Sequence, residues 1–504
     1  MVWGFAVLAA VLLALPFGAV GGEFLLHPGA ALHSLVSARI FGLLAATLAR
    51  SAAVTALAVV LGLMMGVLLL RTDLPGRRFA LAFHVLPLFV SPFLLALGLA
   101  QLFGRTGFLG SEWTTAALYG EPGAIGIQVL AFTPIVTALV GLGLSSVDAS
   151  LEDAGHISAP PWRVLSGVLL PLSLPSLALG ALLVFALSFS ELGVPMFVRV
   201  RAYPAAVFAR LGGMTYEPGE AVGLVVPLLA VALCLLAIER WIAGRMPAVR
   251  GLRRDLPQLP LGRSRWAVAI PLFAICCTAL APLVGLAIRA APALSAVPRW
   301  MGNSVLTSLL SAALAATSVT VLATVLGFSL GRGQMAGRLV DALATLSFVT
   351  PAAVLGIGLI TVWNHRATSW LYGSVGILIV GWSARYAVLA LRPVALGVGL
   401  SPVSLEDAAR VAGARFLRLL FLVVTPLQRR ALAAGWLFAL AFALRDLETA
   451  VMYYPPGSEP LAVRIFTLEA NGPLAVVAAL ALVQVVLSAG VVAAGASLLR
   501  GRTA

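Results

Sequence analysis

The sequence contains no lysine, so all 33 of its basic residues are arginines. This excludes a nucleotide-binding P-loop and a Schiff-base mechanism, because both chemistries need a lysine amine. Any ATP that drives this protein must therefore be bound by another chain. Charged residues make up only 10% of the 504 residues, whereas a soluble domain carries about a quarter. The three cysteines lie in apolar runs without metal-ligand spacing, so they predict no metal site.

Apolar residues make up 61% of the chain, and too few polar residues remain to cover them in water. Lipid must therefore be the solvent for much of this surface. Apolar runs of about 20 residues, the length that crosses a bilayer, recur along the whole chain. We predict an all-α membrane protein with 12 spans, near residues 3–20, 49–70, 80–103, 124–146, 172–194, 219–238, 266–289, 304–330, 340–362, 374–397, 431–449 and 473–497.

The net charge of +14 raises the question of nucleic-acid binding. The arginines, however, lie between the apolar runs, where they orient a membrane protein because positively charged loops stay in the cytoplasm. One alternate set of loops holds 20 arginines and the other set holds nine. We therefore expect no nucleic-acid partner, and we expect the arginine-rich loops and both termini in the cytoplasm.

The chain repeats itself in order and in detail. Val90-Ser-Pro92 matches Val349-Thr-Pro351, and Leu151-Glu-Asp-Ala154 matches Leu405-Glu-Asp-Ala408. Each copy contains six predicted spans, an even number, so both copies have the same orientation in the membrane. A twofold pseudo-axis along the membrane normal, a common transporter plan, would relate them.

A basic, proline-containing segment separates the two copies. Residues 239–265 hold seven arginines, three prolines and three glycines. We predict one half at residues 1–240, a cytoplasmic linker at 241–265 and a second half at 266–504. Within the halves, Pro92 and Pro351 are expected to kink the third and ninth spans.

One loop in each half carries most of the functional information: residues 147–171 (the first loop) and 399–426 (the second loop). Each predicts a short helix with an acidic first turn, a break at a small residue, a second short helix with an aromatic residue and arginine, and a proline that starts the next span. Such a helix suits a groove on a partner protein. The candidate partner-contacting residues are Glu152, Asp153, Ala154, Ser158, Trp162, Arg163, Asp407, Ala408, Ala409, Gly413, Phe416 and Arg418.

The spacing in both loops resembles the EAA loop of ATP-binding-cassette (ABC) importer permeases. That pattern is Glu-Ala-Ala, three residues, Gly, nine residues, then Ile-x-Leu-Pro. Asp407-Ala408-Ala409 and Gly413 fall at this spacing in the second loop, and Glu152-Asp153-Ala154 and Ser158 do so in the first, each before a closing proline. The main departure is Ser158 in place of glycine, so we expect damage to the second loop to cost more transport than damage to the first.

The resemblance extends over nearly the whole chain and implies the type I ABC importer permease fold. Residues 190–195 and 444–457 are similar to the ferric-iron type within a subfamily that also imports thiamine and 2-aminoethylphosphonate, which makes ferric iron the expected solute. The resemblance implies a multi-pass protein of the bacterial inner membrane that is not itself an enzyme and binds no cofactor. Two partner ATPase subunits would bind ATP and Mg²⁺ and grip the two loops from inside. A periplasmic or lipid-anchored solute-binding protein would deliver the solute, and alternating access would pass it inward.

Glu191 and Asp446 each lie 20 residues after the proline that starts their span, about 30 Å along a helix at 1.5 Å per residue. Acidic residues at membrane depth are candidates for function, and carboxylate oxygens suit a hard cation. With Glu448 and Arg385, they are the candidate residues of a translocation pathway between the halves. The alternative is a pair of interfacial acids in contact with water, with Asp446 paired to a neighbour such as Arg445.

An ion-coupled secondary transporter with twelve helices in two halves is the alternative function. It would explain the repeat but not the paired loops, and it should show a proton or sodium relay inside the membrane. The sequence shows only scattered candidates for such a relay, including His84 in the third span.

Overall fold

A computed structural model describes residues 2–35, 38–211, 218–245 and 259–500. Over these residues the chain is helical, and its one strand-like pairing is an isolated bridge between Thr72 and Leu259. Two compact units form. Unit 1 combines Met1–Ser37, Val207–Leu233 and Pro292–Ala504, and unit 2 combines Ala38–Ala206 and Cys234–Ala291. Of the predicted linker, residues 246–258 lie outside the described part.

The predicted membrane spans correspond to helices of the structure, which confirms the all-α membrane fold. Nine described helices are long and apolar enough to cross a bilayer: Trp3–Leu26, Arg39–Arg71, Glu121–Ser145, Pro161–Ser190, Gly219–Ala243, Gly262–Met301, Ser304–Gly331, Gly376–Leu400 and Leu474–Gly495. The other three predicted spans are bent helix pairs, Arg77–Phe89 with Pro92–Phe103, Met335–Val349 with Ala352–Trp363, and Phe416–Leu427 with Arg429–Arg445.

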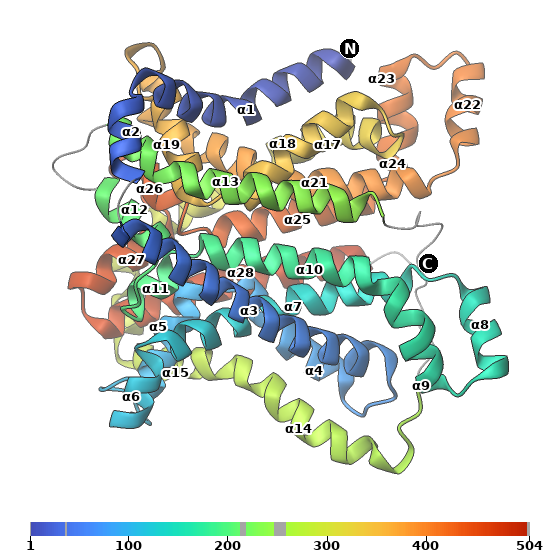
Figure 1. The fold of residues 1–504 in the computed structure, drawn as a ribbon, viewed down its shortest axis with the longest axis horizontal. Coiled ribbons are helices and arrows are strands. Elements are labelled where there is room, and N and C mark those ends of the chain that lie inside the picture. The colour runs from blue at the N-terminus through green and yellow to red at the C-terminus, as the bar shows by residue number, and fades with distance from the viewer. Residues whose placement is uncertain (1, 36–37, 212–217, 246–258, 501–504) are drawn as a thin grey trace. The chain divides into compact units, whose positions relative to one another are not determined.

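Unit 2 is built around the long helices α3, α7 and α10, which pack on one another (Figure 1). Its elements are α3 (Ala38–Arg71), α4 (Arg77–Val85), η1 (Leu86–Phe89), α5 (Pro92–Phe103), α6 (Glu112–Leu118), α7 (Glu121–Ser145), α8 (Ala149–Ser158), α9 (Pro161–Val164), η2 (Leu165–Leu169), α10 (Leu170–Ser190), α11 (Gly193–Phe197), η3 (Gly262–Ser264), α14 (Arg265–Cys277), η4 (Thr278–Leu280) and α15 (Ala281–Ala290). Helices α12 (Tyr203–Leu211) and α13 (Pro218–Ala243) contribute residues to both units.

Unit 1 is built in the same way around α17, α21 and α25. Its elements are α1 (Val2–Leu26), α2 (Pro28–Leu35), η5 (Ala291–Ala296), α16 (Val297–Met301), α17 (Ser304–Gly331), α18 (Met335–Val349), α19 (Ala352–Trp363), η6 (Arg366–Thr368), α20 (Ser369–Tyr372), α21 (Gly376–Leu400), α22 (Val403–Val411), α23 (Phe416–Leu419), η7 (Leu420–Val424), α24 (Thr425–Leu427), α25 (Arg429–Arg445), α26 (Ala450–Tyr453), α27 (Leu461–Asn471) and α28 (Leu474–Arg500).

The first helix of each half packs with the other half. Helix α1 lies against α17, α18 and α19 in unit 1, whereas α14 and α15 lie against α4 and α5 in unit 2. Glycine permits the closest approach in both places, because a Cβ on Gly358 would overlap the backbone of Pro16 and one on Gly98 would overlap that of Pro282. The compact units therefore do not follow the boundaries 1–240 and 266–504, which remain a prediction about the repeat along the chain.

Prolines break the chain at the two places predicted for kinks. Ser91 and Thr350 have extended backbone, and Pro92 and Pro351 follow them at the start of α5 and α19. A residue before proline is disfavoured in a helix, which explains why the helix ends there. The bends are 109° and 113°. Because each bend exceeds a right angle, the chain turns back on itself, and the break is larger than the kink that the sequence predicts.

Candidate functional site

The first and second loops each form the two short helices that the sequence predicts. In the first loop Asp148 directly precedes α8, and its Oδ1 accepts a hydrogen bond from the backbone N of Ser150 at 2.9 Å. This N-cap satisfies one donor of the first turn. In the second loop α22 begins after Pro402, which offers no such cap. Figure 1 shows α8 and α22 each beyond the end of the long helix that follows it, α10 or α25.

The turn between the two short helices differs from one loop to the other. In the first loop α8 ends at Ser158, and Ala159 (φ −145°) and Pro160 (φ −65°) continue as extended backbone into α9. In the second loop α22 ends at Val411, and Gly413 follows with φ +82°. Glycine adopts this left-handed conformation without steric cost. The small-residue breaks therefore fall where predicted, but only the second uses a conformation that favours glycine.

In the first loop, Glu152 points inward to an arginine. The residue is 1% exposed, and its carboxylate accepts hydrogen bonds from both terminal nitrogens of Arg71, the fully buried last residue of α3. The ring of His156 lies farther off, with Nε2 3.6 Å from Oε1. Burying a charge is costly unless it is paired, so each side chain requires the other in this position. The pair fixes α8 to the end of α3.

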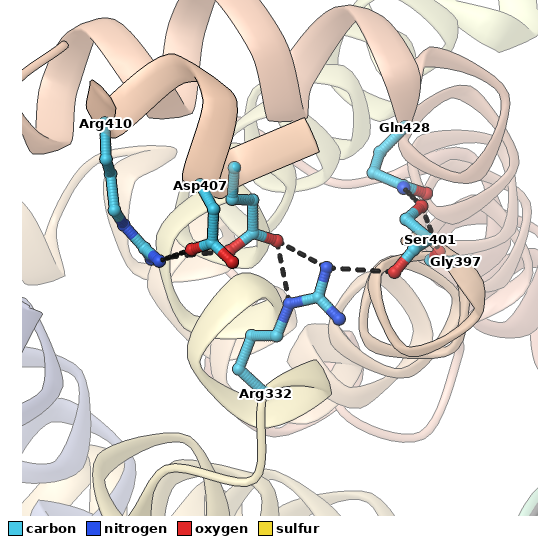
Figure 2. Close-up of polar contacts among 7 residues, drawn as sticks. Arg332, Gly397, Ser401, Asp407, Arg410 and Gln428 are labelled. Carbon is cyan, nitrogen blue, oxygen red and sulfur yellow. Dashed lines mark hydrogen bonds and ion pairs between the residues drawn. The ribbon is translucent and has the colours of Figure 1, made fainter. Parts of the chain in front are cut away.

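The second loop has the same kind of anchor. Glu406 is 4% exposed, and its Oε1 accepts a hydrogen bond from Arg332 Nε at 2.7 Å. Arg332 follows the last residue of α17, and its Nη2 also donates to the carbonyl of Ser401 at 3.1 Å. Figure 2 shows the Arg332 side chain reaching between Ser401 and the pair Asp407 and Arg410. Arg410 adds a second cation, with Nη2 3.4 Å from Glu406 Oε2.

A further hydrogen bond ties the second loop to the span that follows it. Gln428 lies at the 78° bend before α25, and its Nε2 donates to the Ser401 hydroxyl at 2.8 Å (Figure 2). That hydroxyl donates in turn to the carbonyl of Gly397 at 2.9 Å. The ends of α17, α21 and α25 are thus joined through one polar network at the base of α22.

These anchors correct the register between the two loops by one residue. The EAA-like spacing aligns Glu152 with Asp407, whereas the buried acids paired with arginine are Glu152 and Glu406. Asp153 and Asp407, both exposed, are then equivalent. The sequence predicted that Glu152 contacts a partner protein. In the structure its carboxylate pairs with Arg71 and holds α8 to the end of α3. The repeated Leu-Glu-Asp-Ala motif, at 151–154 and 405–408, aligns the two loops in this same register.

The sequence prediction missed Glu406, Arg71 and Arg332 as members of the site. The two arginines served only to predict orientation, and each meets its acid across 81 or 74 residues of chain. One sequence signal exists, because each arginine lies at or just after the end of the second span of its half. The sequence gives no sign, however, that these arginines are buried rather than solvated.

Each loop presents a bare apolar side chain at the end of its first short helix. Ile157 is 89% exposed and Val411 is 90% exposed, and the corrected register aligns them. The predicted small residues Ala154 and Ala408 are also exposed, and Ala409 is half-buried. Because the charged anchor faces inward, the surface offered by each helix combines exposed apolar side chains with one carboxylate and one basic residue, His156 in α8 and Arg410 in α22.

The aromatic residues of the second short helices behave differently. Trp162 is 63% exposed, with the Arg163 guanidinium 5.4 Å from its ring centre. Phe416 is half-buried and packs edge-on against Phe328 of α17 at 6.2 Å. Arg418 is exposed. Trp162 and Arg163 thus extend the outer surface of the first loop, whereas Phe416 anchors the second.

The two anchors lie at the same place along their helices. In unit 2 Gly66 faces Val140, and in unit 1 Gly327 faces Val394 in the same way. Arg71 lies five residues after Gly66, and Arg332 lies five residues after Gly327. Glu152 and Glu406 each lie 12 residues after their valine. The register of the anchor is therefore the same in both units.

The candidate pathway acids occupy matching places, each within its own unit. Glu191 and Asp446 follow the last residues of α10 and α25, and both are 6% exposed. Each carboxylate accepts a hydrogen bond from the backbone N three residues later, Val194 at 3.1 Å and Thr449 at 3.0 Å. Both acids therefore cap the turn that leaves the span.

Arg385 joins this group in unit 1. Its Nη1 donates to the Thr449 hydroxyl at 2.6 Å and its Nη2 to Glu448 Oε2 at 3.1 Å. The second oxygen of Asp446 is also buried. The structure thus gathers Arg385, Asp446 and Glu448, while Glu191 belongs to unit 2. Their role in a pathway stays a prediction.

The described residues contain no group of three or more His, Cys, Asp or Glu side chains placed to hold a metal ion. Cys276 is buried, Cys277 is half-buried and Cys234 is exposed, all without a disulfide.

Residues 58–248 match the family described as "Binding-protein-dependent transport system inner membrane component". The molybdenum transport system permease protein of Escherichia coli K12 is 32% identical over 206 residues, which are 38% of this chain and 89% of that protein. The ferric transport system permease protein of Actinobacillus pleuropneumoniae is 22% identical over 401 residues, 73% of this chain and 58% of that protein. A putative 2-aminoethylphosphonate transport system permease protein of Salmonella choleraesuis is 29% identical over 218 residues, 40% of this chain and 74% of that protein.

Proposed function

Because the chain belongs to the family of binding-protein-dependent transport system inner membrane components, we propose that its two loops receive the ATPase subunits of an ABC importer. The observation that carries this proposal is the repeated design of α8 and α22. Each helix is anchored inward by a buried acid and arginine, and each presents an exposed apolar residue, Ile157 or Val411, at its end. A bare apolar side chain on a protruding helix is a surface that a partner would cover.

Two ATPase subunits, one for each loop, would bind and hydrolyse ATP, because this lysine-free chain has no P-loop of its own. The excess of arginine in one set of loops favours a position on the cytoplasmic side of the inner membrane for the first and second loops and for both termini. A periplasmic or lipid-anchored solute-binding protein would then meet the opposite side.

The anchors suggest how movement of an ATPase subunit reaches the spans. Arg71 is the end of α3 and Arg332 adjoins the end of α17, so a force on α8 or α22 acts directly on a membrane helix. ATP binding would shift the equilibrium of the permease between inward-open and outward-open states, and hydrolysis would reset it. The ATPase subunits would bind the inward-open and outward-open states with different free energies, and the anchors would make each loop move together with its span.

Ferric iron is the solute that we propose. Two relatives whose similarity covers 73% of this chain are a ferric transport system permease protein and a putative one. Relatives named for molybdenum and 2-aminoethylphosphonate transport match a shorter stretch, so an oxyanion is the competing solute class. Equilibrating the cognate binding protein with ferric iron, molybdate and 2-aminoethylphosphonate tests this choice. Retention of molybdate or the phosphonate, without iron, would overturn the iron assignment but not the importer.

Reconstitution tests the function itself. The purified chain, its co-purifying ATPase and the binding protein are placed in proteoliposomes that contain ATP, and solute entry is followed. We expect entry to require ATP and to persist when proton and sodium gradients are collapsed. Entry without ATP that stops when an ion gradient collapses would instead establish an ion-coupled secondary transporter.

A further inference from the structure

The end of the linker is attached to the first loop's supporting helix. The backbone N of Leu259 donates to the carbonyl of Arg71 at 2.6 Å, and the backbone N of Asp73 donates to the carbonyl of Leu259 at 3.4 Å. These bonds form the isolated bridge between Thr72 and Leu259. The side chain of Asp73 adds a third hydrogen bond, because its Oδ1 accepts one from the backbone N of Leu261 at 2.9 Å. We call residues 259–261 the strap.

The strap is also held by apolar packing. Leu261 packs against a buried cluster that contains Met65, Leu69 and Leu74 from the α3 side and Leu272 from α14. Burial of such side chains stabilises the contact in addition to the hydrogen bonds. The strap is therefore held to the end of α3 and the turn that follows it by both hydrogen bonds and apolar packing.

Arg71 connects the strap to the first loop. Its carbonyl accepts the hydrogen bond from Leu259, while its guanidinium holds the buried Glu152 of α8. A continuous series of contacts thus runs from residue 259 through Arg71 and Glu152 to α8, all within unit 2.

The second loop is supported differently. There Ser401, at the end of α21, and Gln428, two residues after the closing proline, hydrogen-bond to each other and reach the anchor through Arg332. In the first loop Ser146 and Ser173 occupy these two places, at the end of α7 and two residues after the proline. Their hydroxyls donate only to carbonyls of their own helical segments, Gly143 and Leu170. The described part of the first loop therefore lacks this polar network.

We propose that the strap is a positioning element of the first loop, which takes the place of the polar network that supports the second. The linker is then a working part of one coupling site as well as a connection between the halves. The link to ATPase binding rests on the proposed function, but the support of α8 by the strap does not.

Hydrogen exchange of the purified chain in nanodiscs, with no partner present, tests the support. Leu259→Pro removes the N–H that reaches Arg71, and Asp73→Ala removes the acceptor for Leu261. We expect either substitution to speed exchange in 149–158 by about five- to tenfold, the effect of losing one or two hydrogen bonds, while 403–411 stays unchanged. Leu252→Pro, in the linker but outside the described residues, is the matched control and should change neither segment.

Unchanged exchange in 149–158 for both strap variants would overturn the proposal. So would an equal increase in 149–158 and 403–411, because it would indicate general loosening of the fold rather than support of one loop.

Cross-linking to the ATPase separates this inference from the proposed function. In a background with the three native cysteines replaced by serine, Ile157→Cys and Val411→Cys are each joined to the ATPase by a bifunctional thiol reagent. Leu259→Pro is expected to lower the yield at Ile157→Cys and to leave that at Val411→Cys unchanged. A strap variant that speeds exchange in 149–158 but lowers neither yield would overturn the role in coupling. The absence of any cross-link in the unaltered background would refute the proposed function, while the exchange result would still stand.

Discussion

The first and second loops place the same anchor in different surroundings. Glu152 meets a fully buried arginine, and the backbone N of Leu259 in the linker donates a hydrogen bond to the carbonyl of that arginine. Glu406 meets a partly exposed arginine and has Arg410 as a second cation, within a network that includes Ser401 and Gln428. Both copies of the repeat therefore keep the buried ion pair, whereas the contacts that support the pair differ between the two loops. Loss of the anchor should therefore have unequal consequences.

Removing the anchoring arginines should give the largest effect. Arg71→Met removes the arginine that pairs with the buried Glu152 carboxylate, and the cost should be about 3–5 kcal/mol, as for other broken buried pairs. Arg332→Met should cost less, because Arg410 remains 3.4 Å from Glu406. Thermal unfolding of the purified chain in detergent, compared at equal lipid content, measures both.

The double variant Arg71→Met with Glu152→Met is the control for this prediction. It should recover most of the lost stability, since apolar side chains of similar size can replace a buried ion pair. Equal losses for Arg71→Met and Arg332→Met would contradict the claimed difference in surroundings.

Substitutions at the turns come next. Gly413 has φ +82°, where any other L-residue costs roughly 1–2 kcal/mol, whereas Ser158 is an exposed helix end. Transport by Gly413→Trp should therefore fall well below that of Ser158→Trp. Gly413→Ala isolates the backbone term, because no atom lies within 4 Å of an added Cβ. Equal transport losses from the two tryptophan variants, at equal expression, would remove this asymmetry.

The helix caps should give a smaller, local effect. Asp148→Ala removes the N-cap of α8 and should destabilise that helix by about 1 kcal/mol. Pro402→Asp supplies a cap that α22 lacks and should slow its hydrogen exchange. Exchange rates of 149–158 and 403–411 report the two changes separately. A response of α22 to Asp148→Ala would show that the loops are not independent.

The exposed pair of Arg410 and Asp407 should matter least. Their side chains are 52% and 60% exposed, with Nη1 2.8 Å from Oδ1. Such pairs contribute about 0–1 kcal/mol and are screened by salt. Asp407→Asn should therefore leave thermal stability nearly unchanged at high ionic strength. A large, salt-independent loss would show that Asp407 is part of the anchor after all.

The sequence sufficed for features set by local chemistry. Apolar runs located the spans, prolines located the breaks near residues 91 and 350, and small residues located the ends of α8 and α22. The spacing in the two loops also predicted the importer family, which the comparisons confirm. All of these signals lie within a few turns of one helix.

Features set by long-range contacts were missed. The arginines at 71 and 332 meet acids that lie far along the chain, so no local pattern marks them as buried. The packing of α1 in unit 1 and of α15 in unit 2 depends on close contacts of Pro16 and Pro282 with glycines of the other half. The linker was predicted as a tether, and its pairing with residues 71–73 became visible only in three dimensions.

We propose that Ile157 and Val411 mark two ATPase-binding surfaces. The most direct measurement is the amount of ATPase that co-purifies with Ile157→Asp, Val411→Asp and the double variant at equal yields of the tagged chain. Phe108→Asp, at another exposed apolar residue remote in sequence from both loops, is the control. We expect a reduced amount of co-purifying ATPase for each single variant, none for the double variant and no change for the control. An undiminished amount of ATPase with the double variant would contradict the proposal.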